Sequence, residues 1–95
     1  MARYFARVEL HNGDSDDYET LHTKLKVKGF SNCITIKSGG SKKLPTGFYV
    51  ATLGEVVVSK VAKTVKDAAD STGLDNEVVV VKSEGSFSYL SEECN

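Results

Sequence analysis

The chain has 95 residues, of which 40% are hydrophobic and 26% are charged, and its formal net charge is −1. This composition is typical of one globular domain and excludes a disordered or fibrous chain, while the near-zero charge gives no global basic field of the kind that marks many nucleic-acid binders. A chain of this length buries only about 60–65% of its unfolded surface, so we expect a homodimer to add stability. No hydrophobic run is long enough for a signal peptide or a membrane span, so we expect a cytoplasmic protein without a membrane partner.

Residues 3–11 alternate and predict the first strand. One face carries Tyr4, Ala6, Val8 and Leu10, and the other carries Phe5, Arg7, Glu9 and His11. A turn follows at residues 12–13. Ser15 then reads as the N-cap of a helix, because acidic residues occupy the first turn behind it. The apolar stripe of this helix is Tyr18, Leu21 and Leu25, and Gly29 marks its end.

A hairpin is predicted next. Its first arm spans residues 30–37 and contains a β-branched run, residues 38–41 reverse the chain, and the second arm spans residues 47–53. Between Glu55 and Gly73 the apolar residues recur with a period of 3.6, which predicts a second helix with a lysine-rich outer face. Four consecutive valines within residues 77–82 form the last strand, and residues 84–95 form a polar tail that could add an edge strand.

The order of elements is strand, helix, strand, strand, helix, strand. With right-handed crossovers, both helices lie on one face of a four-stranded antiparallel sheet, so the predicted fold is α+β, a ferredoxin-like βαββαβ sandwich over residues 1–83. The opposite sheet face is partly apolar, because Phe5 and the valine run contribute to it. We expect either the tail residues Phe87, Tyr89 and Leu90 or a second protomer to cover it.

The two cysteines, Cys33 and Cys94, show no metal-ligand spacing and are expected to stay free thiols in a reducing compartment. Asp14, Asp16 and Asp17 could hold a hard cation, but a role at the helix N-terminus is favoured.

The residues with catalytic potential lie on the outer face of the first strand. His11 could act as a general acid or base beside Glu9, and Arg7 could steady a scissile phosphate. The alternative for His11 is a solvent-exposed histidine at the end of a strand, and His22 is expected to pack at the core boundary. No cofactor fingerprint or metal-ligand spacing is visible, so neither a cofactor nor a metal is expected.

Six lysines and no acid occupy residues 24–43. Lys37, Lys42 and Lys43 flank the turn and could follow a phosphate backbone, while Phe48 and Tyr49 could stack on an unpaired base. The alternative is that the lysines favour the C-terminal half of a helix and keep a hairpin soluble.

Several short motifs occur together over about residues 2–82: the run from Tyr4 to His11, Asp17-Tyr18-Glu19-x-Leu21-His22, Gly29-Phe30-Ser31, Leu44-Pro45-Thr46 and Ser71-Thr72-Gly73. With the lysine-rich second helix and the valine strand, they resemble a bacterial family of small proteins related to the GhoS-type antitoxins. That resemblance implies a ferredoxin-like fold similar to the CRISPR-associated small nucleases and cleavage of a membrane toxin's messenger RNA. Those nucleases usually place an aspartate near the end of the first strand, where this chain has Glu9 and His11, and this departure speaks against metal-dependent cleavage.

The expected function is therefore a small RNA-interacting protein that binds single-stranded or messenger RNA, with endoribonuclease as the activity if it is an enzyme. The alternative is a non-catalytic module, such as a phage- or plasmid-encoded regulator or inhibitor, that binds another protein through the open sheet face or an edge strand.

Overall fold

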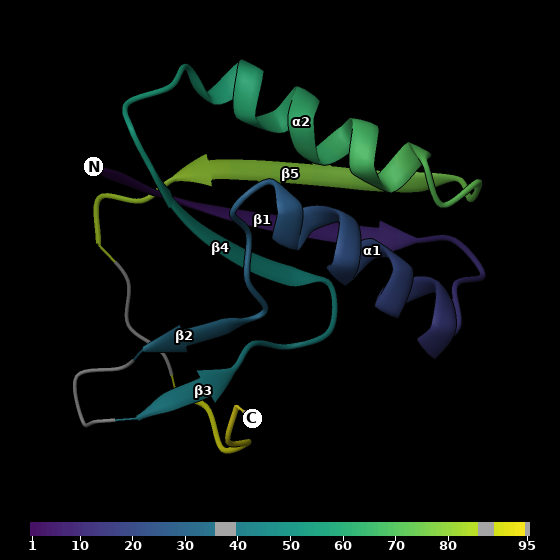
Figure 1. Cartoon of the computed structure of the whole chain (residues 1–95), viewed down its shortest axis with the longest axis horizontal. Coiled ribbons are helices and arrows are strands. Elements are labelled where there is room, and N and C mark those ends of the chain that lie inside the picture. The colour runs from purple at the N-terminus through teal and green to yellow at the C-terminus, as the bar shows by residue number, and fades with distance from the viewer. Residues whose placement is uncertain (36–39, 86–88, 95) are drawn as a thin grey trace.

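Two helices and two antiparallel sheets make up the fold (Figure 1). The computed structural model describes residues 1–35, 40–85 and 89–94. In chain order the elements are β1 (Ala2–Leu10), α1 (Ser15–Val27), β2 (Cys33–Thr35), β3 (Ser41–Lys43), β4 (Phe48–Leu53), α2 (Val58–Asp70) and β5 (Asn76–Lys82). The prediction of a small α+β fold is confirmed.

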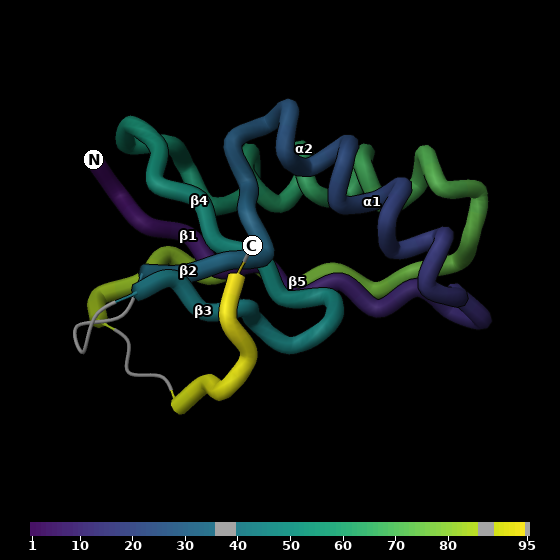
Figure 2. Tube along the Cα trace, turned by 60° about the horizontal axis from the view of Figure 1, so that its bottom comes forward, coloured from purple at the N-terminus to yellow at the C-terminus, as the bar shows by residue number. Residues whose placement is uncertain are grey.

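The main sheet has the order β4-β1-β5, and both outer strands run antiparallel to β1. Both helices lie on the same side of this sheet, and the hairpin of β2 and β3 lies on the other side with the C-terminal segment (Figure 2). The inward side chains of β1 are fully or almost fully buried, as its alternation predicts: Tyr4, Ala6, Val8 and Leu10.

The main core lies between this sheet and the helices. Leu21 and Leu25 of α1 and Val61 and Val65 of α2 pack into it, and each is at most 3% exposed. Burial of one such side chain typically stabilises a fold by about 1.5–3 kcal/mol. The apolar stripes identified in the sequence therefore fix which face each helix turns towards the sheet.

The four-stranded sheet is not observed in the described residues, which form sheets of three and two strands. β2 pairs with β3, a short polar strand that the sequence did not predict, rather than with β4. The segment before β2 touches β4 at a single bridge, where Ser31 and Val50 exchange two backbone hydrogen bonds of 2.8 Å. Because β3 folds back directly against β2, the predicted hairpin closes before the chain reaches β4.

A second apolar cluster covers part of the other sheet face. Ile34 and Leu44 from the hairpin region and Val50 of β4 form its buried part. Leu90 packs against it, as expected for the tail, but Tyr89 is 91% exposed, and Phe87 lies outside the described residues. The β5 side of this face remains open, with Val79 61% and Val81 51% exposed.

The start of α1 differs from the prediction by one residue. Asp14, not Ser15, is the N-cap: its carboxylate accepts from the backbone N–H of Asp17, and the Asp17 carboxylate accepts from that of Asp14. The hydrogen bond from the Asp17 backbone lowers the pKa of Asp14. The acidic run is thus a capping box, as the helix-terminal interpretation expects.

No helix among the described residues is long and apolar enough to cross a membrane.

Candidate functional site

The exposed end of β1 carries the candidate catalytic residues. Glu9 is exposed on the sheet face that points away from the helices, and His11 directly follows the strand. The backbone N–H of His11 donates to the carbonyl of Asp75 at 2.8 Å, which holds this end of β1 against the start of β5. The two side chains therefore project from a backbone that is fixed by strand pairing.

Register adds a third residue, Glu77, at the start of β5. Glu77 lies directly opposite Glu9 in the antiparallel pair, and its carboxylate lies 3.1 Å from Nε2 of His11. One ligand atom from each of Glu9, His11 and Glu77 lies within 4.8 Å of the other two. We call these three residues the strand-end cluster. It is open to solvent, since the His11 and Glu77 side chains are 46% and 71% exposed.

Glu77 was not identified as a site residue from the sequence. The available signal was weak: it starts the last strand with an outward side chain, but nothing in the sequence reports which residue of β1 it faces. The pairing of β1 with β5 supplies that information.

Arg7, two residues before Glu9, lies partly buried towards β4. Its Nη1 donates to the carbonyl of Val8 at 3.0 Å, and its guanidinium lies 5.7 Å from the centre of the Phe48 ring. Gly47 makes room for this arrangement, because a Cβ there would lie 2.3 Å from the Val8 carbonyl oxygen at a φ of +83°. Arg7 shares the face of the strand-end cluster but is engaged with Phe48 in this conformation.

The residues predicted to stack on RNA point to opposite faces of β4. Phe48 is half-buried beside the second apolar cluster, whereas Tyr49 is 1% exposed and lies in the main core. The Tyr49 hydroxyl lies 2.6 Å from Nδ1 of His22 on α1, and burial raises the pKa of Tyr49. Tyr49 is therefore unavailable to an unpaired base in this structure, because neighbouring residues of a strand face opposite ways.

His22 packs at the core boundary, as expected. Its ring meets that of Tyr49 edge to face, with centroids 5.3 Å apart, and burial lowers its pKa. The sequence therefore identified its position correctly.

The hairpin lysines meet acids from the C-terminal segment. Lys42 forms an ion pair with Glu93, and Nζ of Lys43 lies 3.9 Å from a Glu92 oxygen. The backbone N–H of Lys43 also donates to the carbonyl of Glu92 at 2.9 Å. The third predicted RNA-binding lysine, Lys37, lies outside the described residues. The charge of this surface is thus partly neutralised from within the chain.

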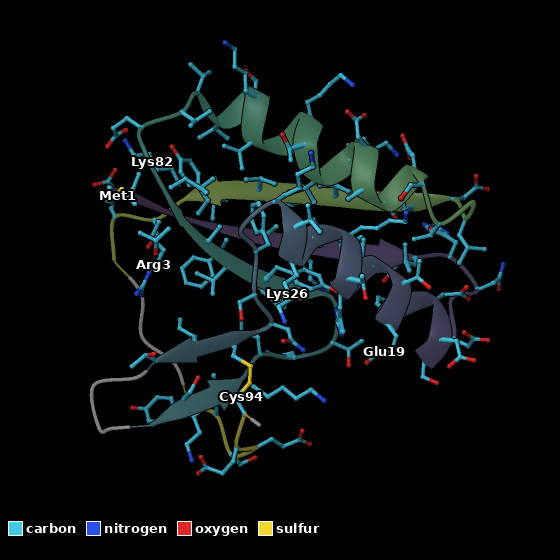
Figure 3. All side chains as sticks on the ribbon, in the orientation of Figure 1. Met1, Arg3, Glu19, Lys26, Lys82 and Cys94 are labelled. Carbon is cyan, nitrogen blue, oxygen red and sulfur yellow. A yellow bond between two sulfur atoms is a disulfide. The ribbon has the colours of Figure 1, made fainter. Side chains whose placement is uncertain are left out.

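The prediction of free thiols is wrong for this structure, in which Cys33 and Cys94 form a disulfide (Figure 3). Their Cα atoms lie 6.0 Å apart, within the usual range for a bridge. The bridge joins β2 to the C-terminal segment. A hydrogen bond from the backbone N–H of Cys94 to the carbonyl of Ser41, on the paired strand β3, holds the two segments side by side. Sequence spacing could not reveal this approach across 61 residues.

Comparison with known proteins gives no family for the chain. No family model matches it, and no curated protein matches its sequence. Among solved structures, the fold is similar to the yeast copper transporter domain Ccc2a, determined in the apo and Cu(I)-loaded states. The identity is 20% and the TM-score 0.45, over 83% of this chain and 96% of that one. A likeness of this size does not indicate what this chain binds, and the resemblance to the antitoxin family stays a prediction.

Proposed function

We propose that this protein interacts with RNA and cleaves it, as an antitoxin-like endoribonuclease would. The observation that carries the proposal is the hydrogen-bonded pair of His11 and Glu77 on an exposed sheet face, with Glu9 beside it. A carboxylate that orients an imidazole is the arrangement used for general acid–base chemistry. An open surface also suits a substrate as large as an RNA strand.

The chemistry follows from the ring nitrogens of His11. When Nε2 donates to Glu77, Nδ1 is the proton acceptor. In the proposed step, Nδ1 takes the proton of an RNA 2′-hydroxyl, the 2′ oxygen forms a bond to phosphorus, and the bond from phosphorus to the 5′ oxygen breaks. The leaving oxygen takes a proton from solvent, which gives a 2′,3′-cyclic phosphate and a 5′-hydroxyl. Arg7 would turn from Phe48 to the phosphate and stabilise its developing charge.

RNA would reach the hairpin lysines only by displacing acids of the same chain. Lys42 and Lys43 are engaged with Glu93 and Glu92, and phosphate oxygens would take the place of these carboxylates. Such binding should weaken steeply as salt rises, because phosphate contacts release counterions. This property separates RNA binding from apolar association.

We also propose a ferredoxin-like sheet and a homodimer for this protein. The order β5-β1-β4, followed by the Ser31–Val50 bridge, supports a ferredoxin-like sheet whose fourth strand is reduced to one bridge. The open valines of β5 support a homodimer. We further propose that the protein works in the cytoplasm, because its RNA substrate would be there. Reducing thiols in that compartment would act against the Cys33–Cys94 disulfide.

The test is binding and cleavage of single-stranded and structured RNAs by purified protein at low and moderate salt. Wild-type protein should release fragments with cyclic phosphate ends. The double variant Glu9→Gln plus His11→Ala should bind RNA but leave it intact. Both positions are exposed, so its free energy of unfolding should change by less than about 1 kcal/mol. Absence of RNA binding even at low salt would refute the proposal.

A second candidate function is a protein-binding module, and the edge strand β5 favours it. Val79 and Val81 are more than half exposed on a strand that has a paired neighbour on one side only in the described sheet. Such an edge can accept a strand from another protein. This function would replace the first if the protein had no RNA affinity but formed a complex with another protein. That complex should persist at high salt and be lost in Val79→Lys.

A further inference from the structure

The strand-end cluster has the donor set of a transition-metal site. One imidazole nitrogen and two carboxylates, from Glu9, His11 and Glu77, converge from two neighbouring strands. We propose that these three residues bind a divalent transition-metal ion, with Zn²⁺ as the best fit. The sequence predicts no metal, because residues 9 and 77 come together only through the β1–β5 register.

The charges around the cluster favour a cation. Glu9 and Glu77 are directly opposed across the strand pair, and like charges in that position are destabilising unless something neutralises them. In the described parts of the chain, Glu77 has the His11 ring as its hydrogen-bond partner and Glu9 has no ion pair. A divalent ion between the two carboxylates would remove this repulsion.

The geometry needs little change to hold the ion. Zinc bonds to nitrogen and oxygen at about 2.0–2.2 Å, so neighbouring ligand atoms around a tetrahedral ion lie roughly 3.3 Å apart. Nε2 of His11 and Oε2 of Glu77 are already 3.1 Å apart, and the longest of the three separations is no more than 4.8 Å. Rotation of the exposed Glu9 side chain would bring its carboxylate oxygen to this distance from the other two ligand atoms. The backbones of both strands stay in place, because they are fixed by pairing.

The mixture of ligands selects the kind of ion. Mg²⁺ and Ca²⁺ prefer sites built from oxygen atoms alone, whereas an imidazole with carboxylates suits Zn²⁺ and its neighbours in the first transition series. Three protein ligands also leave a fourth position for water. The inference goes beyond the proposed ribonuclease activity: an ion at Nε2 of His11 would replace the hydrogen bond to Glu77 and leave the ring proton on Nδ1, so the metal-bound form would not take the 2′-hydroxyl proton. Metal binding is measured without RNA, so failure of one is distinguishable from failure of the other.

The experiment is a calorimetric titration of the purified, disulfide-bonded protein with Zn²⁺, without chelator or reductant. Visible absorption of the Co²⁺ complex provides a second readout. We expect one ion per chain, and His11→Ala or Glu77→Gln should weaken binding at least about tenfold, since even outer-shell partners are commonly worth that much. The matched control is His22→Gln, which removes the other histidine and should retain wild-type affinity.

Two results would overturn the inference. One is the absence of a saturable Zn²⁺ signal with wild-type protein. The other is equal affinity in wild type and His11→Ala, or a loss in His22→Gln as large as that in His11→Ala. Circular dichroism of each variant checks that it is folded: His11 and Glu77 are exposed, and at the half-buried position 22 glutamine keeps a polar side chain next to Tyr49.

Discussion

Removal of the Cys33–Cys94 disulfide should destabilise the protein strongly. The bridge spans 61 residues, and in the chain-entropy model a loop of that size stabilises the fold by about 4 kcal/mol through its effect on the unfolded state. Measured losses for native disulfides are commonly about 2–5 kcal/mol. The bridge should also stabilise the folded state locally, because it holds the C-terminal segment against β3, where the backbones of Glu92 and Lys43 are hydrogen-bonded.

The assay is urea unfolding of oxidised wild type and of Cys33→Ser plus Cys94→Ser. With a denaturant slope of about 1 kcal/mol per molar urea, typical of small proteins, the midpoint of the variant should lie about 2 M or more below that of wild type. Dithiothreitol should lower the wild-type midpoint to that of the variant and leave the variant unchanged. Equal midpoints for oxidised wild type and variant, or two freely reactive thiols in the native oxidised protein, would refute the reasoning.

Three further predictions concern the core, the half-buried His22 and the C-terminal acids. Tyr4→Phe should cost about 1–2 kcal/mol in chemical unfolding, because its hydroxyl donates to the carbonyl of Val56 at 2.6 Å and accepts from the N–H of the same residue at 2.9 Å; an unchanged midpoint would show that water replaces both bonds. Burial lowers the pKa of His22, so the unfolded chain takes up the proton first and stability falls as pH drops below about 6.5. The melting temperature of wild type should therefore fall more between about pH 7.5 and pH 5.5 than that of His22→Gln, and parallel falls would contradict this. Glu92→Gln plus Glu93→Gln should tighten RNA binding at low salt by freeing the hairpin lysines, and filter binding that shows no gain would argue against those lysines as the RNA contact.

The sequence predicted the elements whose apolar pattern is long and regular. The alternation of residues 3–11 matches β1 to within one residue at each end, and the stripes of both helices point to the core. β3 was missed because Ser41-Lys42-Lys43 carries no apolar residue, so its strand conformation comes from pairing with β2 alone.

The candidate site was predictable only in part. Strand alternation correctly predicts that Glu9 and His11 lie on the outer face. The predicted stacking pair of Phe48 and Tyr49 conflicts with the same rule, because neighbouring residues of a strand face opposite ways. Glu77 and the pairing of the lysines with the tail depend on register and on long-range approach. Neither is encoded in local patterns.

The proposal that the exposed end of β1 cleaves RNA is tested most directly by comparing cleavage rates of one RNA by wild type, His11→Ala and His22→Gln. We expect wild type and His22→Gln to produce fragments with cyclic phosphate ends at similar rates, whereas His11→Ala remains folded and cleaves no faster than RNA degrades alone. Cleavage by His11→Ala at the wild-type rate, or the absence of cleavage by wild type, would contradict it.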